Sequence, residues 1–110
     1  MKRVMAFSKH LYLGNGIDNN DIKNIQKQLR KKPMNSHFFL ICISSNKCDH
    51  LDIFEALQMG QTYYRKNPPR VVGIANNKTE ALQLIEDIVK ECLENTGSLN
   101  LKEYLNVNFG

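Results

Sequence analysis

The stretch Phe38-Phe39-Leu40-Ile41-Cys42-Ile43 is apolar throughout and is followed at once by Ser44-Ser45-Asn46. An apolar run without alternation is typical of a strand that is buried on both faces of a sheet. A buried helix is the alternative, but the run between polar breaks has the length of a strand. It therefore predicts a central strand that projects Phe39, Ile41 and Ile43 to one face and Phe38, Leu40 and Cys42 to the other.

The segment before this strand reads as a strand followed by a helix. Residues 4–7 are apolar, and residues 11–13 extend the run after a polar break, which predicts a bulged first strand. The residues 18–21 (Asp-Asn-Asn-Asp) can cap a helix, because an Asx side chain accepts from backbone N–H groups. That helix carries Ile22, Ile25 and Leu29 at spacings of three and four, and its basic end precedes Pro33.

The segment after the central strand repeats the pattern twice. Asp49 can cap a second helix, which residues 67–69 (Asn-Pro-Pro) end. Residues 71–75 are a third apolar strand, and Asn77 with Glu80 has the spacing of a capping box for a third helix that Gly97 can end. The apolar residues expected on the second helix are Leu51, Ile53, Phe54, Leu57 and Tyr64, and those on the third are Ala81, Leu82, Ile85, Ile88, Val89, Cys92 and Leu93.

The order of elements predicts the fold class. Strands that alternate with helices indicate right-handed crossovers and a parallel sheet. We therefore expect residues 1–110 to form a single small α/β domain, β-α-β-α-β-α, with a three-stranded, mainly parallel sheet and with residues 98–110 as a short helical turn and tail. A strand order of 2-1-3 gives three layers, and 1-2-3 gives two layers with one open sheet face. The sequence leaves this order open.

Composition restricts the class of protein. The chain has 110 residues, 42% hydrophobic and 24% charged, which is an ordinary globular balance. No apolar run approaches the roughly 18 residues of a membrane span, and the apolar segment after Met1-Lys2-Arg3 is too short for a signal peptide. The three cysteines are an odd number, which favours a reduced protein. We expect a cytoplasmic protein without a membrane partner.

The loops that follow the strands are polar and uncharged. On a parallel sheet they would meet at the carboxyl edge, where α/β proteins bind ligands and where helix N-termini attract anions. The alternative is that these residues only cap helices and form turns. The candidate residues for binding a small ligand or anion are Ser8, His10, Ser44, Ser45, Asn46, Asn76, Asn77 and Thr79.

Basic residues concentrate where the first two helices are expected to end, and on a parallel sheet they would form one basic pole. The net charge of +4 and the pI of about 9.0 agree with such a surface. Cations at helix C-termini also complement the helix dipole, and no nucleic-acid motif accompanies them. We therefore expect at most weak, sequence-insensitive nucleic-acid binding by the pole, which comprises Arg30, Lys31, Lys32, Arg65, Lys66 and Arg70.

No pattern predicts catalysis, a metal or a cofactor. Gly14-Asn15-Gly16 lacks the third glycine of a dinucleotide fingerprint. Cys48-Asp49-His50, together with His10 and His37, fits no zinc spacing. We expect no catalytic residue, no metal ligand and no cofactor, and we favour a protein that is not an enzyme.

A non-catalytic module that acts by self-association or by binding a protein partner is the first functional expectation. Binding of a small ligand or anion at the carboxyl edge is the alternative, and nucleic-acid binding by the basic pole is the third. The third helix has more apolar surface than a small sheet can cover, which predicts a homodimer. The competing prediction is that residues 98–109 fold back over that helix with Leu101, Tyr104 and Leu105 as the covering side chains.

Overall fold

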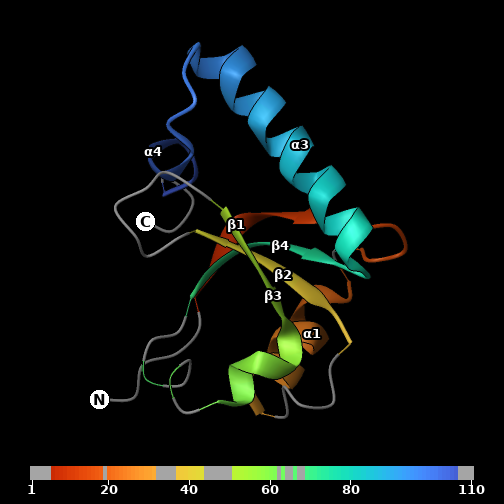
Figure 1. Ribbon diagram of the computed structural model, residues 1–110. Coiled ribbons are helices and arrows are strands. Elements are labelled where there is room, and N and C mark those ends of the chain that lie inside the picture. Colours follow the sequence, from red (N-terminus) through yellow and green to blue (C-terminus); the bar gives the residue numbers. More distant parts are fainter. Residues whose placement is uncertain are drawn as a thin grey trace.

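The computed structural model describes residues 6–18, 20–31, 37–43, 51–61, 63, 66 and 69–106. Its helices pack on both faces of one sheet, α3 and α4 on one face and α1 on the other (Figure 1). The elements in chain order are β1 (Ala6–Leu13), α1 (Ile22–Lys31), β2 (Phe39–Ile43), β3 (Leu51–Glu55), the 3₁₀ helix η2 (Ala56–Gly60), β4 (Arg70–Ala75), α3 (Lys78–Thr96) and α4 (Leu101–Asn106).

The sheet is mixed and has four strands in the order β1-β4-β2-β3. β1 and β4 are parallel, whereas β2 runs antiparallel to both β4 and β3. The α/β class is confirmed, but the prediction of three mainly parallel strands is wrong, and neither proposed order is found. The strands predicted as first, second and third stand in the order 1-3-2, with a further strand beyond the second.

The error arises at residues 51–55, which form a strand and not the start of a helix. Leu51, Phe54 and Leu57 have helical spacing, yet Leu51 and Ile53 also alternate with polar Asp52, and the structure follows the alternation. β2 and β3 pair antiparallel from Phe39–Glu55 to Ile43–Leu51. β2 also pairs antiparallel with β4, so β1 and β4 are the parallel pair of the sheet. Asp49 and Tyr64, which the helix prediction included, lie outside the described residues.

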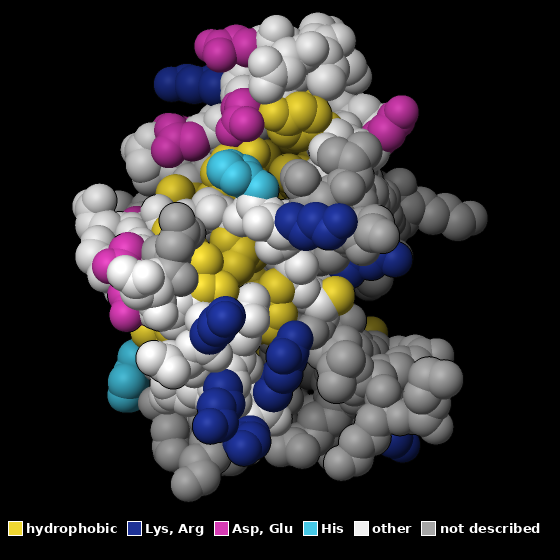
Figure 2. Space-filling view, turned by 180° about the vertical axis from the view of Figure 1, so that it is seen from behind, with side chains coloured by type: hydrophobic (Ala, Val, Ile, Leu, Met, Phe, Trp, Pro, Cys, Tyr) yellow, Lys and Arg dark blue, Asp and Glu magenta, His cyan; other side chains and the backbone are white. Residues whose placement is uncertain are grey.

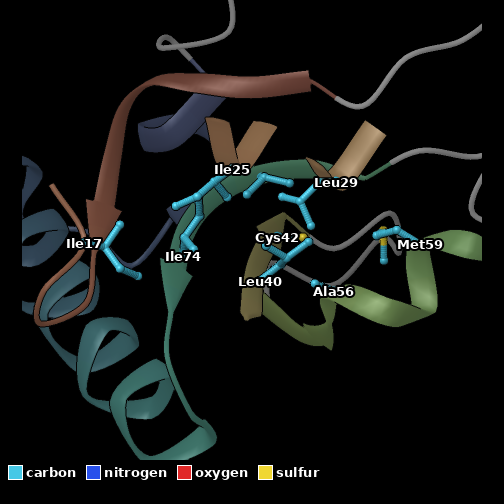
Figure 3. Packing of buried hydrophobic residues seen from close by; sticks show 9 residues of the cluster. Ile17, Ile25, Leu29, Leu40, Cys42, Ala56, Met59 and Ile74 are labelled. Carbon is cyan, nitrogen blue, oxygen red and sulfur yellow. The ribbon is translucent and has the colours of Figure 1, made fainter. Parts of the chain in front are cut away.

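The central strand is buried on both faces, as predicted. Leu40, Ile41 and Cys42 are fully buried. Leu40 and Cys42 belong to the core under α1 and η2, and Figure 3 shows them on the same side of the sheet as Leu29 of α1. Ile41 belongs to the core under α3. The rest of each set follows its predicted face, with Phe38 packed on the α1 side and Phe39 and Ile43 on the α3 side.

The predictions for the flanking elements are largely confirmed. The bulge in β1 appears as a register shift between Phe7 and Tyr12. α1 buries Ile25 and Leu29. α3 starts after Asn77 and ends at Gly97, whose φ of 69° is left-handed and whose N–H donates to a carbonyl of the last turn.

The segment after α3 folds back, as the competing prediction had it. α4 contacts α3, and both Leu101 and Leu105 are buried in the core on that face. The hydroxyl of Tyr104 donates to Glu91 of α3 at 3.1 Å, and the Asn95 amide donates to that hydroxyl at 2.8 Å. α4 therefore covers one flank of α3. The last predicted residues of the tail, from 107 onward, lie outside the described residues.

Candidate functional site

A hollow of about 310 Å³ opens where β1 turns into α1. It lies at the carboxyl end of the parallel pair, since β1 ends at Leu13 beside Ile74 of β4. This is the place where an α/β sheet offers a ligand site. Its lining is polar and apolar in mixture, with a carboxylate and no basic side chain, and consists of Gly16, Ile17, Asp21, Asn24, Ile25, Gln28, Phe38 and Asn76.

The polar groups beside this hollow bind one another. The Asn76 amide donates to the carbonyl of Asn15 at 2.6 Å and to Glu80 Oε1 at 2.9 Å, and its backbone N–H donates to the same carboxylate oxygen at 2.9 Å. The backbone hydrogen bond from Asn76 is the largest cause that lowers the pKa of Glu80. A Cβ at Gly14 would overlap the Glu80 carboxylate, so a larger residue there would displace that carboxylate from its hydrogen bonds. This network holds the β1–α1 turn against the start of α3.

The members of the predicted ligand-binding set that the structure describes do not gather at one edge. Ser8 and His10 lie within β1, where the Ser8 hydroxyl donates to the His10 carbonyl at 2.9 Å and accepts from its N–H at 3.2 Å. Asn77 caps α3 through its side-chain oxygen, which accepts from the Glu80 N–H at 2.8 Å. Thr79 is exposed in the first turn of α3, while Ser44, Ser45 and Asn46 lie outside the described residues. Ligand binding by this set stays a prediction.

The antiparallel direction of β2 is the reason why a single carboxyl edge does not form. Ile43, the last residue of β2, pairs with Arg70, the first residue of β4. The chain therefore leaves β2 at the edge opposite to Asn76, which follows the end of β4. β2 and β4 thus end at opposite ends of the sheet.

The basic residues are brought together in part. Arg30 and Lys31 end α1, and the Arg30 guanidinium lies 5.3 Å from the centroid of the Phe7 ring. Phe7 pairs with Val71, next to Arg70, so these three basic residues share the end of the sheet where β1 and β4 begin. Lys66 is exposed, and Lys32 and Arg65 lie outside the described residues. Nucleic-acid binding by this pole stays a prediction.

In the part of the chain that the structure describes, no cluster of side chains is suited to cysteine or metal chemistry. Cys42 and Cys92 are buried and unpaired, and burial raises the pKa of the Cys42 thiol. Within the described ranges no three His, Cys, Asp or Glu side chains converge as metal ligands. Those ranges also contain no helix with the length and apolar character needed to cross a bilayer. The predicted Cys48-Asp49-His50 combination lies outside them.

A stripe of apolar residues runs along one side of α3. Helical geometry of 3.6 residues per turn places Leu82, Ile85, Val89 and Leu93 within a narrow sector, next to the buried sector of Ile88. Leu82 is 51% exposed and Leu93 is 49% exposed, while Ile85 and Val89 are half-buried. We call these residues the α3 stripe.

The opposite side of α3 is occupied. Glu91 and Asn95 bind Tyr104 of α4, and Glu91 also hydrogen-bonds Tyr12 of β1. Burial first, and then this bond to Glu91, raises the pKa of Tyr12. Glu91 thus directs its side of α3 towards β1, which is one edge strand of the sheet. The α3 stripe is on the other side of the helix and therefore lies towards β3, the other edge strand, where Leu51 and Ile53 are half-buried.

Basic residues also line α1 along its length, a feature that the sequence analysis did not identify. Lys23 and Lys27 are exposed about two turns and one turn, respectively, before Lys31. Lysines and arginines gather on this part of the surface (Figure 2). The signal was available in the sequence, since residues 22–31 contain basic residues at four-residue spacing and no acidic residue.

Comparisons with known proteins give no relative: no protein-family model, no curated protein and no solved structure matches this chain.

Proposed function

We propose that this protein is a non-catalytic module that acts as a homodimer through the α3 stripe and the edge strand β3. The observation that carries this proposal is the exposure of Leu82 and Leu93, at about half of each side chain, on a helix side that continues into the half-buried residues of β3. An apolar helix side next to a sheet edge is the kind of surface that proteins bury against a partner.

The charges beside the stripe favour a second copy as the occupant. In a pair of antiparallel α3 helices related by a two-fold axis near Asp87 and Ile88, Leu82 of one copy lies opposite Leu93 of the other. Within one residue of this register, Ile85 lies next to Val89 of the other copy. On the solvent side of the stripe Glu86 comes equally close to Lys90 of the other copy, and two-fold symmetry repeats this contact of opposite charges. An unrelated partner would not explain why the stripe and its charges complement themselves.

The hydrogen-bonding direction of β3 is compatible with this dimer. Ala56 donates its N–H to the Phe38 carbonyl at 2.8 Å, so alternate residues before it, Phe54 and Asp52, also direct their backbone groups to β2. The backbone groups of Leu51 and Ile53 therefore point to the outer edge of the sheet. Two copies of β3 centred on Ile53 would avoid apposing the Asp52 carboxylates, because Asp52 would face Phe54.

Binding of a small anion at the β1–α1 hollow is the weaker alternative. The lining contains Asp21 and no basic residue, which disfavours an anion. The Asn76 amide and the Glu80 carboxylate already bind within the protein, so they are not arranged to receive a ligand.

Sedimentation equilibrium at micromolar protein concentration tests the proposal. We expect a mass of twice 12.7 kDa and a dimer that Leu82→Glu dissociates, because two-fold symmetry would bring a charge into the apolar contact at both of its ends. Leu99→Glu is the matched control, since Leu99 is 57% exposed and lies beyond the end of α3. A monomeric wild-type protein, or equal dissociation by both variants, contradicts the proposal.

A charge exchange tests the register. Glu86→Lys leaves two basic residues at the paired positions, and Lys90→Glu leaves two acidic ones, so each variant alone should dimerise less well than the wild type. Mixed together, the two variants should form a heterodimer in which every such pair is complementary. An intrahelical effect of these substitutions would not depend on mixing, so failure of the mixture to assemble would refute the register.

A further inference from the structure

The exposed side of α1 carries a continuous basic ridge. Lys23, Lys27, Arg30 and Lys31 lie within one sector of the helix, opposite the buried Ile25 and Leu29. They border a shallow hollow of about 360 Å³ along the helix. The segment has no acidic residue, so this short helix alone has the net charge of +4 that the whole chain has.

The stability of α1 does not explain this arrangement. Arg30 and Lys31 complement the C-terminal end of the helix dipole, but Lys23 stands in the first turn, where a positive charge is unfavourable. Lys23 with Lys27 and Lys27 with Lys31 are like-charge pairs at four-residue spacing, which destabilise a helix. Within the described ranges, no carboxylate forms an ion pair with any of these three lysines. A ligand with several negative charges would relieve the repulsion.

We infer that this basic ridge binds the phosphate backbone of a nucleic-acid duplex. Lys23, Lys27 and Lys31 follow one another at about one helical turn, roughly 6 Å, so they present a line of cations to a line of phosphates. The ridge differs from the predicted basic pole because it runs along the helix and includes Lys23 and Lys27. No side chain on it is arranged to read bases, so binding is insensitive to sequence.

The composition of the same helix face argues for a duplex over a membrane or a single strand. Its exposed neighbours are polar, such as Asn24, and no exposed apolar residue of α1 could enter a lipid surface. Proteins that bind single strands combine cations with aromatic rings that stack on bases. Among the described residues the aromatic side chain with large exposure is Tyr63, which is not part of α1.

Fluorescence anisotropy of a labelled mixed-sequence DNA duplex, measured over a series of salt concentrations, tests the inference. For one ridge, four phosphate contacts predict a slope of log affinity against log salt of about −3.6, and hence a loss of affinity on the order of 10²-fold between 50 and 200 mM salt. The triple variant Lys23→Gln, Lys27→Gln and Lys31→Gln should lower the slope to about −1 and leave the circular dichroism spectrum unchanged, because all three residues are exposed.

Single charge reversals supply the matched control. Lys27→Glu should reduce the steepness of the slope by about 1 and weaken binding at least about fivefold. Lys78→Glu changes the net charge equally on another helix and should leave affinity within about twofold. The inference would be overturned if the two variants had equal effects. It would also be overturned by tighter binding to the single strand than to the duplex, or by binding to vesicles with anionic lipid but not to the duplex. A finding that the protein is monomeric would not overturn this inference, because the ridge belongs to one chain.

Discussion

The contact between Ile41 and Gly73 at the centre of the sheet allows a quantitative test of the core. Ile41 is fully buried, and β2 pairs it with Gly73 of β4. A Cβ built on Gly73 would lie 3.0 Å from Ile41 Cδ1 and 3.1 Å from the Tyr12 carbonyl oxygen. Both distances are tighter than ordinary van der Waals contact. The glycine therefore makes room for the isoleucine, and the two positions should be energetically coupled.

Three variants measure this coupling. Ile41→Val deletes Cδ1 and should lower the free energy of unfolding by about 0.5–1.5 kcal/mol, while Ile41→Ala should lower it by about 2–5 kcal/mol. Gly73→Ala alone should be destabilising, because overpacking costs about 1–3 kcal/mol and the stiffer unfolded chain offsets only about 0.4–1 kcal/mol. In the double variant Ile41→Val, Gly73→Ala, the new methyl group enters the space of the deleted one.

Equilibrium urea unfolding of the wild type, both single variants and the double variant gives the answer. We expect the double variant to be more stable than the sum of the single effects by about 1 kcal/mol, since contacting residues couple by about 0.5–3 kcal/mol. The Tyr12 carbonyl limits the gain because backbone cannot move away as a methyl group can. Additivity within about 0.3–0.5 kcal/mol would refute the close approach of β2 and β4 at this point.

Three further outcomes follow from the start of α3 and from the buried thiols. Asn77→Ala removes the helix cap and should lower the free energy of unfolding by about 1 kcal/mol, measured by urea unfolding, whereas Asn77→Ser should retain most of it. Glu80 has a lowered pKa in the folded state, caused first by the hydrogen bond from the Asn76 backbone N–H. Its carboxylate therefore contributes fully to the free energy of unfolding above the unfolded pKa of about 4.3, and this contribution is lost as pH falls through the folded pKa. Unfolding curves at pH 6 and at about pH 3 should therefore show a smaller loss of stability on acidification for Glu80→Gln than for the wild type; an equal loss would contradict the assigned hydrogen bonds. Cys42 and Cys92 are buried, so mass spectrometry after brief alkylation should find both unmodified in the folded protein and both modified in denaturant, and rapid labelling of Cys42 in buffer would be inconsistent with the packing of β2.

The parts of the fold that were predictable from sequence are those that local physics specifies strongly. Residues 38–43 have no alternation and therefore require cover on both faces. Asn77 and Gly97 delimit α3 by cap chemistry. Residues 51–55 carry two incompatible periods, because Leu51 with Phe54 and Leu57 reads as a helix while Leu51 with Ile53 reads as a strand. The neighbouring strand selects the strand conformation, because residues 51–55 pair with β2 and this tertiary pairing overrides the local helical spacing.

The candidate ligand site depended on the direction of β2. The expected carboxyl edge required every strand to point the same way, but Ile43 and Ala75, the last residues of β2 and β4, lie at opposite ends of these antiparallel strands. The basic residues at the end of α1 were identifiable, because β1 and α1 do form the expected unit. The α3 stripe was visible as surplus apolar surface, but only the placement of α4 shows which half of that surplus is covered.

The two proposed surfaces lie on opposite faces of the sheet, and this arrangement connects them. A two-fold axis beside β3 and perpendicular to the sheet would place both copies of α1 on the same face, so a dimer would present two basic ridges to one duplex. Two linked ridges bind more tightly than one because the second contact is intramolecular. Leu82→Glu should then weaken duplex binding and lower the salt slope towards the value for a single ridge, although Leu82 lies far from α1 in sequence and on the other face. The triple lysine variant should bind duplex poorly yet sediment as a dimer. If Leu82→Glu dissociates the dimer without any change in the salt slope, the two ridges do not act on one duplex, and the two surfaces serve separate partners.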